Sequence, residues 1–324
     1  MTKPATFRNP LMARGPDPWM VWHHGFYYLT ATSSGGIHVR RAASITQLAA
    51  AQDILVWSDD TPSRCTQMWA PEFYLLDGPN GRRWYLYYTA SDGVDANHRV
   101  FVLEGQAEGD EATPLGPYAF KAQLRTDPHD ALYAIDAGLI QRADGSLFCV
   151  WAGHPHHRLF VSAMENPWTL RGERVLLEAD GFGCAEVREG PVALRRNGRI
   201  FLIYSACDTG KPDYKLGMLV SDEDADLMDP ASWRQHPEPV FERCDRNGVF
   251  GPGHNGFFHS PDGSETWIIY HAKTTSRYTY RDRTPRAQRI AWNTAGEPVL
   301  GVPLPLEAEV PVPSGDPADQ EKSR

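Results

Sequence analysis

The sequence predicts an all-β fold, and specifically a five-bladed β-propeller. Its composition favours short strands joined by turns, because the 324 residues include 28 Gly and 26 Pro, and 11% of them are aromatic. Five apolar, aromatic segments of similar pattern recur along the chain, and a turn that contains glycine precedes each of them. One hairpin repeated at nearly even spacing indicates a repeat architecture.

Each of the five segments is predicted to be a strand, and each ends in Thr, Ser, His or Ala. Aromatic and β-branched residues dominate these segments, as in buried strands. In chain order they are residues 26–31, 84–90, 147–152, 200–206 and 267–272. We expect each to be the second strand of a blade.

The turns before these strands carry the strongest short-range hairpin signal, a glycine next to a polar residue between two apolar runs. The glycines are 53 to 65 residues apart and are Gly25, Gly81, Gly145, Gly198 and Gly263. Units of this length are somewhat longer than the 40 to 50 residues typical of a propeller repeat. A two-sheet sandwich is the alternative fold, but it gives no reason for five evenly spaced hairpins.

The five units predict one propeller domain over residues 1–310. Residues 311–324 are rich in Pro and polar residues, so we expect them to form a flexible C-terminal tail. The cysteines are odd in number and widely spaced, and no CxxC pair is present, which predicts reduced thiols. They are Cys65, Cys149, Cys184, Cys207 and Cys244.

Charge and hydropathy exclude several classes of partner. The net charge is −9 and the 32 basic residues form no stripe, so no nucleic-acid partner is expected. No apolar run reaches 18 residues, which argues against a membrane partner. Because the first 25 residues lack the apolar segment of a signal peptide, we expect a cytoplasmic protein, monomeric or weakly homo-oligomeric.

A polar residue lies eight or nine residues before each turn glycine, where the preceding strand begins. The first strand of a propeller blade lines the central channel, so these residues are predicted to form a ring at one end of it. Four acids resist burial, which indicates a functional site, a cation or a water-filled channel; a solvated rim of polar strand ends is the alternative. The five residues are Asp17, Glu72, Asp136, Glu189 and His254.

Paired carboxyl groups of this kind carry out the chemistry of most glycoside hydrolases. Asp136 and Glu189 come from adjacent units, and a neighbouring negative charge raises a carboxyl pKa, so Glu189 is predicted to stay protonated as general acid. Asp17 belongs to a unit that is not adjacent to that of Glu189, and the wider separation leaves room for a water molecule, as in an inverting enzyme. We expect Asp17 to be the general base and Asp136 to modulate the acid and hold the sugar.

Five short motifs carry a resemblance to glycoside hydrolase family 43, whose fold is a five-bladed propeller. They are GPDPWM around Asp17, WAPE at 69–72, AIDAGLI around Asp136, EGP at 189–191 and GPGHNGFF around His254. The resemblance covers roughly residues 8–305. It implies an inverting mechanism with Asp17 as base, Asp136 as modulator and Glu189 as acid, which agrees with the assignment from the ring.

Two further segments, MENPWTL at 164–170 and PRAQRIAWNTAGEP at 285–298, resemble the exo-acting α-L-arabinofuranosidases of that family. The resemblance implies release of terminal α-L-arabinofuranosyl residues from arabinan or arabinoxylan oligosaccharides, which would be the binding partner. A β-xylosidase on the same scaffold is the nearer alternative. A sugar-binding propeller without catalysis is the other, although it has no use for a protonated acid.

Four residues are candidates for substrate or ion binding. Trp69 either stacks on a sugar or packs between blades, and Glu72 faces the ring. By resemblance, Arg286 supplies an arginine to the active site, with Arg289 as competitor. The resemblance also implies that His254 touches a hydrated ion, commonly Ca²⁺; otherwise it is a neutral histidine bonded to water. No cofactor is expected for the chemistry itself.

The second strand of each hairpin returns to the end of the channel where the ring lies, so the loops after these strands should wall the pocket. These loops are residues 91–98, 153–158, 207–214 and 273–283. His154, His156 and His157 lie in one of them, but no fourth ligand at a suitable spacing supports a zinc site. An acidic segment, residues 222–233, lacks the Gly and Glu of a calcium loop, and we expect a solvated connection there.

Overall fold

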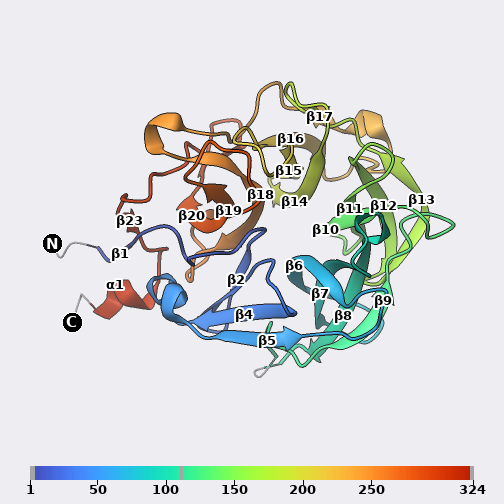
Figure 1. Cartoon of the computed structure of the whole chain (residues 1–324), viewed down its shortest axis with the longest axis horizontal. Helices are drawn as coiled ribbons and strands as arrows, with labels where there is room; N and C mark the ends of the chain where they lie inside the picture. The colour runs from blue at the N-terminus through green and yellow to red at the C-terminus, as the bar shows by residue number, and fades with distance from the viewer. Residues whose placement is uncertain (1–3, 110–111, 322–324) are drawn as a thin grey trace.

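The computed structural model describes residues 4–109 and 112–321, and they form a five-bladed β-propeller, which confirms the predicted fold class (Figure 1). Each blade is an antiparallel sheet whose strands follow one another in chain order, from the central channel outward. Four blades have four strands and the fifth has three.

The strands of the blades have the following bounds. Blade 1 comprises β2 (Trp19–His23), β3 (Phe26–Thr30), β4 (Ile37–Ala42) and β5 (Asp53–Trp57). Blade 2 comprises β6 (Thr66–Leu76), β7 (Arg83–Ser91), β8 (Arg99–Ala107) and β9 (Ala119–Gln123). Blade 3 comprises β10 (Ala134–Gln141), β11 (Leu147–Gly153), β12 (Arg158–Asn166) and β13 (Thr169–Leu176). Blade 4 comprises β14 (Arg188–Arg196), β15 (Arg199–Ala206), β16 (Lys215–Asp222) and β17 (Arg234–Gln235), and blade 5 comprises β18 (Phe250–His259), β19 (Thr266–Lys273) and β20 (Thr284–Arg289).

Short elements connect and flank the blades. The remaining strands are β1 (Thr6–Phe7), β21 (Ala291–Trp292), β22 (Pro298–Val299) and β23 (Val310–Pro311). The helical elements are the 3-10 helices η1 (Ile45–Ala50), η2 (Asp95–Asn97), η3 (Pro230–Ser232) and η4 (Asp245–Asn247), and the α-helix α1 (Pro317–Glu321). Among the described residues, no helix is long and apolar enough to cross a membrane.

The five predicted segments are the second strands of the blades, β3, β7, β11, β15 and β19, as expected. They are almost fully buried, because both faces of an inner strand pack against other side chains. The glycine before each has a positive φ between 72° and 86° with open space around it, so the turn conformation rather than crowding requires glycine.

The hydrophobic core lies between the blades. Tyr87 and Val102 of blade 2, for example, pack with Leu139 and Trp151 of blade 3, and similar clusters join the other neighbouring blades. Each fully buried side chain of this size contributes about 1.5–3 kcal/mol. The blades are thereby held at fixed angles, which fixes where the first strands begin around the channel.

The two ends of the chain close the ring between blades 5 and 1. β1 pairs with β23, and Phe7 and Val310 join the cluster between these blades. The Asn9 side chain donates to the carbonyl of Ala287 at 3.0 Å and accepts from its N–H at 2.9 Å. Asn9 therefore satisfies the outer edge of β20, where the other blades have a fourth strand.

The expected flexible tail is wrong for residues 311–321, which pack on the fold, while residues 322–324 lie outside the described residues. Val312 is buried, and Asp316 is fully buried, accepting from the backbone N–H of Ile45 at 3.0 Å. The polar composition of this segment concealed a carboxylate that binds the start of η1 rather than solvent.

The expectation that all five cysteines are reduced is also wrong. Cys184 and Cys207 form a disulfide, whereas Cys65, Cys149 and Cys244 are free. The two cysteines are 23 residues apart, but Cys184 shortly precedes β14 and Cys207 directly follows its partner strand β15, which brings their Cα atoms within 5.1 Å. Strand pairing, which local spacing does not show, creates this bond.

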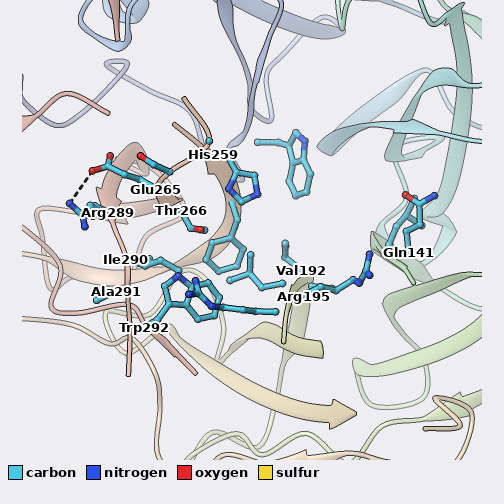
Figure 2. A pocket seen from close by; sticks show the side chains of 18 of the residues that line it. Gln141, Val192, Arg195, His259, Glu265, Thr266, Arg289, Ile290, Ala291 and Trp292 are labelled. Carbon is cyan, nitrogen blue, oxygen red and sulfur yellow. Dashed lines mark ion pairs between the residues drawn. The ribbon is translucent and has the colours of Figure 1, made fainter. Parts of the chain in front are cut away.

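The channel opens into a cavity at each end. The cavity at the hairpin end has a volume of about 850 Å³, and its floor is formed by one first-strand residue from each blade. These residues are Trp19, Tyr74, Leu139, Val192 and Phe257. Polar side chains surround this floor, including Gln141, Arg195 and His259 and the ion pair of Glu265 with Arg289 (2.9 Å) (Figure 2).

Candidate active site

The second cavity, of about 650 Å³, lies at the opposite end of the channel, where the first strands begin. Side chains from all five blades line it, among them Asp17, Trp69, Asp136, Glu189 and His254. Every loop predicted to wall the pocket contributes to it. The contributing residues are Asp95, His154, His157, Asp208, Thr209 and Tyr280.

A repeated backbone feature forms the rim of the channel at this end. One residue at the start of each first strand has a positive φ, and in blades 2 to 5 it lies in a β-bulge opposite the second strand. These residues are Asp17 (55°), Ala70 (44°), Asp136 (56°), Gly190 (53°) and His254 (45°). For the residues other than glycine this conformation costs about 1–3 kcal/mol, and such strain persists only where the surrounding contacts enforce it.

Those contacts run from each blade to the next. The N–H of each rim residue donates to a side chain of the preceding blade: Asp17 to His271 (3.1 Å), Ala70 to Thr32 (2.7 Å), Asp136 to Thr89 (3.1 Å), Gly190 to Asp136 (3.1 Å) and His254 to Ser205 (2.8 Å). Thr89, Ser205 and His271 are the polar residues near the ends of the second strands, so the pattern noted in the sequence has a structural role.

The predicted ring therefore needs correction at two of its five members. Glu189 lies one residue before the rim position and still lines the cavity. Glu72 lies two residues after the rim position of its blade and does not line the cavity. Six residues separate β6 from β7, whereas two separate β2 from β3, so equal distance from the turn glycine does not give equal register.

Glu72 is thus not a substrate-binding residue of this cavity, contrary to the prediction. Its side chain is buried inside the channel, where the hydroxyl of Tyr74 donates to it. Burial raises the pKa of Glu72 to about 8, so it remains largely protonated at neutral pH.

Asp17 is held as a carboxylate by a set of hydrogen bonds. Thr32 donates to Oδ2 at 2.7 Å, and Arg283 donates to Oδ1 at 3.0 Å. Burial opposes ionisation, but the charge of Arg283 and the rings of His254 and His271 outweigh it and hold the pKa of Asp17 well below its usual range. Asp17 is therefore negatively charged and ready to accept a proton.

His271 anchors Asp17 from below. Burial lowers the pKa of His271 to about 4, so the ring is neutral near pH 7. Its Nδ1 accepts from the Asp17 N–H, and its Nε2 lies 3.1 Å from the Thr209 hydroxyl. A neutral ring with the proton on Nε2 satisfies both contacts.

Glu189 has two partners at the cavity wall. The Tyr214 hydroxyl donates to Oε1 at 2.8 Å, and Nε2 of His157 lies 3.2 Å from Oε2. Burial opposes ionisation of Glu189, but the hydrogen bonds and charge of His157, with His254 and Tyr214, lower its pKa. The prediction of a raised pKa is wrong for the substrate-free site, because His157 and Tyr214 were not foreseen as partners.

The raised pKa belongs to Asp136 instead. Burial raises it well above the usual range, and the charges of Glu189 and Asp17 raise it further, against the Gly190 N–H that donates to Oδ2. Asp136 and Glu189 are thus a coupled pair that retains one proton, which resides on Asp136 in the substrate-free site. One charged and one protonated carboxyl group therefore accompany the charged Asp17.

Trp69 takes part in both kinds of contact considered for it. Its ring stacks on His98 with ring centroids 3.9 Å apart, and it also lines the cavity. His98 is held in turn by the carbonyl of Asp95, which lies 2.7 Å from Nδ1. The indole is therefore a fixed apolar wall beside the carboxyl groups.

The arginine of the site is Arg283, and the prediction of Arg286 is wrong. Arg286 is fully buried inside blade 5, where Nε donates to Thr284 Oγ1 at 3.4 Å, and it does not line the cavity. Arg289 pairs with Glu265 at the other end of the channel. Arg283 precedes β20 in a loop over the cavity, and the sequence signal for it was its place at the end of loop 273–283.

His254 lies at the rim beside Asp17, with Nδ1 at 3.4 Å from Oδ1. Its Nε2 is buried and has no hydrogen-bond partner among the described residues. Within residues 4–109 and 112–321, no group of three or more His, Cys, Asp or Glu side chains is arranged to hold a metal ion directly. An ion at this position would therefore contact the protein largely through water.

Comparison with known proteins gives a consistent result. The model of glycosyl hydrolases family 43 matches residues 7–298. The chain is 35% identical to the extracellular exo-α-(1→5)-L-arabinofuranosidase of Streptomyces chartreusis (84% of each chain covered) and 34% identical to α-L-arabinofuranosidase 43 of Humicola insolens (92% of this chain, 63% of that one). The crystal structure of an α-L-arabinofuranosidase from Lactobacillus brevis superimposes with a TM-score of 0.83 at 32% identity, covering 93% of this chain and 98% of that one. The chain thus spans just under two thirds of the Humicola relative, and most of the other two.

Proposed function

The chain belongs to glycosyl hydrolase family 43, and on this premise we propose that it is an inverting exo-hydrolase. It releases terminal α-L-arabinofuranosyl residues from arabinan or arabinoxylan oligosaccharides. The observation that carries the proposal is the cavity in which the charged Asp17 faces the proton-sharing pair of Asp136 and Glu189. The names of the relatives support the choice of sugar.

In this proposal Asp17 is the general base. Its carboxylate takes a proton from a water molecule, whose oxygen attacks the anomeric carbon of the bound sugar. Glu189 donates a proton to the glycosidic oxygen as the bond to the anomeric carbon breaks. The products are arabinose of inverted configuration and an oligosaccharide shortened by one unit.

Asp136 supplies the proton that Glu189 donates. In the substrate-free site the proton of the pair resides on Asp136. A sugar hydroxyl that donates to Asp136 favours the charged form of that carboxyl group, so the shared proton moves to Glu189. Substrate binding thereby arms the acid, and Asp136 both holds the sugar and modulates the acid.

The shape of the cavity supports action at chain ends. It is about 650 Å³ in volume and is walled by loops of all five blades, which suits one or two sugar units rather than a long chain passing through. Trp69 offers an apolar face, and Asp17, Asp136 and Arg283 offer polar groups for the sugar hydroxyls.

The test compares rates of the wild-type protein on 4-nitrophenyl α-L-arabinofuranoside and 4-nitrophenyl β-D-xylopyranoside, with Glu189→Gln as the control for contaminating activity. We expect the arabinoside to be cleaved at least tenfold faster. Faster cleavage of the xyloside would make the protein a β-xylosidase. Sugar binding by calorimetry without cleavage of either compound would make it a binding propeller.

We also propose a calcium ion near His254, because Nε2 of this residue is buried without a partner among the described residues. The ion would hold its own water molecules, one of which would donate to Nε2, and it is not required for the proton transfers. Adding CaCl₂ after EDTA treatment is expected to raise the melting temperature of the wild type but not of His254→Ala. Equal melting temperatures with and without CaCl₂ would contradict the ion.

A further inference from the structure

Two tyrosines are exposed at the mouth of the active-site cavity. Tyr278 and Tyr280 are 59% and 52% exposed, more than any other aromatic residue that the structure describes. Tyr280 lines the cavity, and its carbonyl accepts from Nε of Arg283, the residue that binds Asp17. Large aromatic rings exposed beside a site often mark a surface that binds a ligand.

Hydrogen bonds fix these two rings in place. Their hydroxyl oxygens lie 2.7 Å apart, and each lies within 3.2 Å of Oδ2 of Asp208. The rings meet edge to face with centroids 5.5 Å apart. The Tyr278 ring also lies against the backbone of Gly210, where an added Cβ would come within 3.0 Å of it.

A buried lysine holds the two loops that carry these residues. Nζ of Lys273 donates to the carbonyls of Gly210 (2.6 Å), Lys211 (3.1 Å) and Thr279 (3.3 Å). The N–H of Thr279 also donates to the carbonyl of Gly210 at 2.9 Å. Burying an ammonium group is costly unless it is fully hydrogen-bonded, so the loop geometry is strongly enforced.

The tyrosines lie on the side of the cavity that belongs to the acid. Asp208 comes three residues after Ser205, the strand partner of Glu189, so it is part of blade 4. The leaving group must lie beside the acid that protonates it. The sugar unit of the leaving group is therefore directed toward Asp208 and the two rings.

We propose that Tyr278 and Tyr280 form an aromatic platform for the sugar unit next to the one that is released. This inference rests on the proposed function. The C–H face of a neutral pentose packs on the rings, and its hydroxyls find an acceptor in Asp208, whose charge disfavours an acidic sugar. Because the rings are fixed before binding, little conformational entropy is lost when the sugar binds.

The test uses two substrates that differ in the leaving group. α-1,5-L-Arabinobiose carries a second sugar, whereas α-L-arabinofuranosyl fluoride carries none. For each protein, the value compared is the ratio of kcat/KM for the disaccharide to that for the fluoride. In Tyr278→Ala/Tyr280→Ala we expect this ratio to fall about tenfold.

Two matched variants separate the rings from other effects. Tyr278→Phe keeps the ring and loses the hydroxyl, and we expect a ratio within about twofold of the wild type. Phe120→Ala removes an exposed ring from β9 at the outside of blade 2, and we expect an unchanged ratio.

A ratio that stays at the wild-type value in the double variant would overturn the platform, as would equal losses on both substrates. Wild-type protein that cleaves neither compound would contradict the proposed function itself. Wild-type cleavage of both with an unchanged ratio in the variants would contradict the platform alone.

Discussion

The two ends of the central channel are built from the same five strands, yet they differ in backbone and charge. At the end with the carboxyl groups, each first strand begins with a residue of positive φ that is bonded to the preceding blade. At the hairpin end the strands are regular, and their apolar side chains form a floor. The comparison teaches that the chemistry is located where the strands depart from regular pairing.

The charges at the two ends also differ in their surroundings. Asp17, Asp136 and Glu189 are each less than 10% exposed and share partners. At the hairpin end Arg289 is 65% exposed and pairs with Glu265, while the Arg196 guanidinium lies over the ring of Trp292. Exposed pairs of that kind contribute about 0–1 kcal/mol, so perturbing them should matter far less.

The largest effect is expected from the two proposed proton-transfer residues. Asp17→Asn should lower kcat at least 10³-fold on both arabinobiose and arabinofuranosyl fluoride, because every substrate needs the base. Glu189→Gln should lower kcat by a similar factor on arabinobiose but much less on the fluoride, whose leaving group needs little protonation. Steady-state kinetics on both substrates checks this, and equal losses in the two variants would exchange or remove the roles.

The next effect concerns the arginine that holds Asp17. Arg283→Gln should raise the pKa of Asp17, because the guanidinium is the largest influence that lowers it. The base must be ionised, so the acid limb of the kcat/KM profile should move to higher pH, with a loss of about 10- to 100-fold at neutral pH. A profile with an unmoved acid limb would show that Arg283 does not tune Asp17.

A smaller effect is expected from Glu72, inside the channel between the two ends. Its pKa is about 8 in the fold and near 4.5 when unfolded, so the folded state binds more protons between these values and wild-type stability falls as pH rises. Glu72→Gln should therefore gain about 2–4 °C more in melting temperature, relative to wild type, at pH 8 than at pH 5. Calorimetry that gives the same difference at both pH values would contradict the raised pKa.

The smallest effect is expected at the hairpin end. Arg289→Gln removes an exposed ion pair with Glu265, and we expect kcat within twofold of wild type and a melting temperature within about 1 °C. It is also the matched control for Arg283→Gln. A loss of activity comparable to that of Arg283→Gln would break the contrast between the two ends.

The sequence predicted the blades because a hairpin is a local feature. A glycine turn between two apolar runs needs only neighbouring residues, so β3, β7, β11, β15 and β19 were all found. The register around the channel was less accessible, since bulges and unequal turns displace Glu72 and Glu189 from the position of Asp17 and Asp136.

Contacts between blades could not be counted from the sequence. Arg283 and Arg286 are three residues apart, but one precedes β20 over the cavity and the other lies within it, fully buried. His157 and Tyr214 reach Glu189 from two different loops, and together they reverse the expected shift of its pKa. The Cys184–Cys207 bond likewise depends on the pairing of β14 with β15.

The central claim is that the irregular end of the channel carries out hydrolysis with inversion, through Asp17 and Glu189. The most direct test follows wild-type hydrolysis of α-1,5-L-arabinobiose by proton NMR during the first minutes, before the sugar equilibrates between anomers. The account predicts that β-L-arabinofuranose appears first. Initial release of the α-anomer would contradict it, because retention requires a nucleophilic carboxylate rather than a base that activates water.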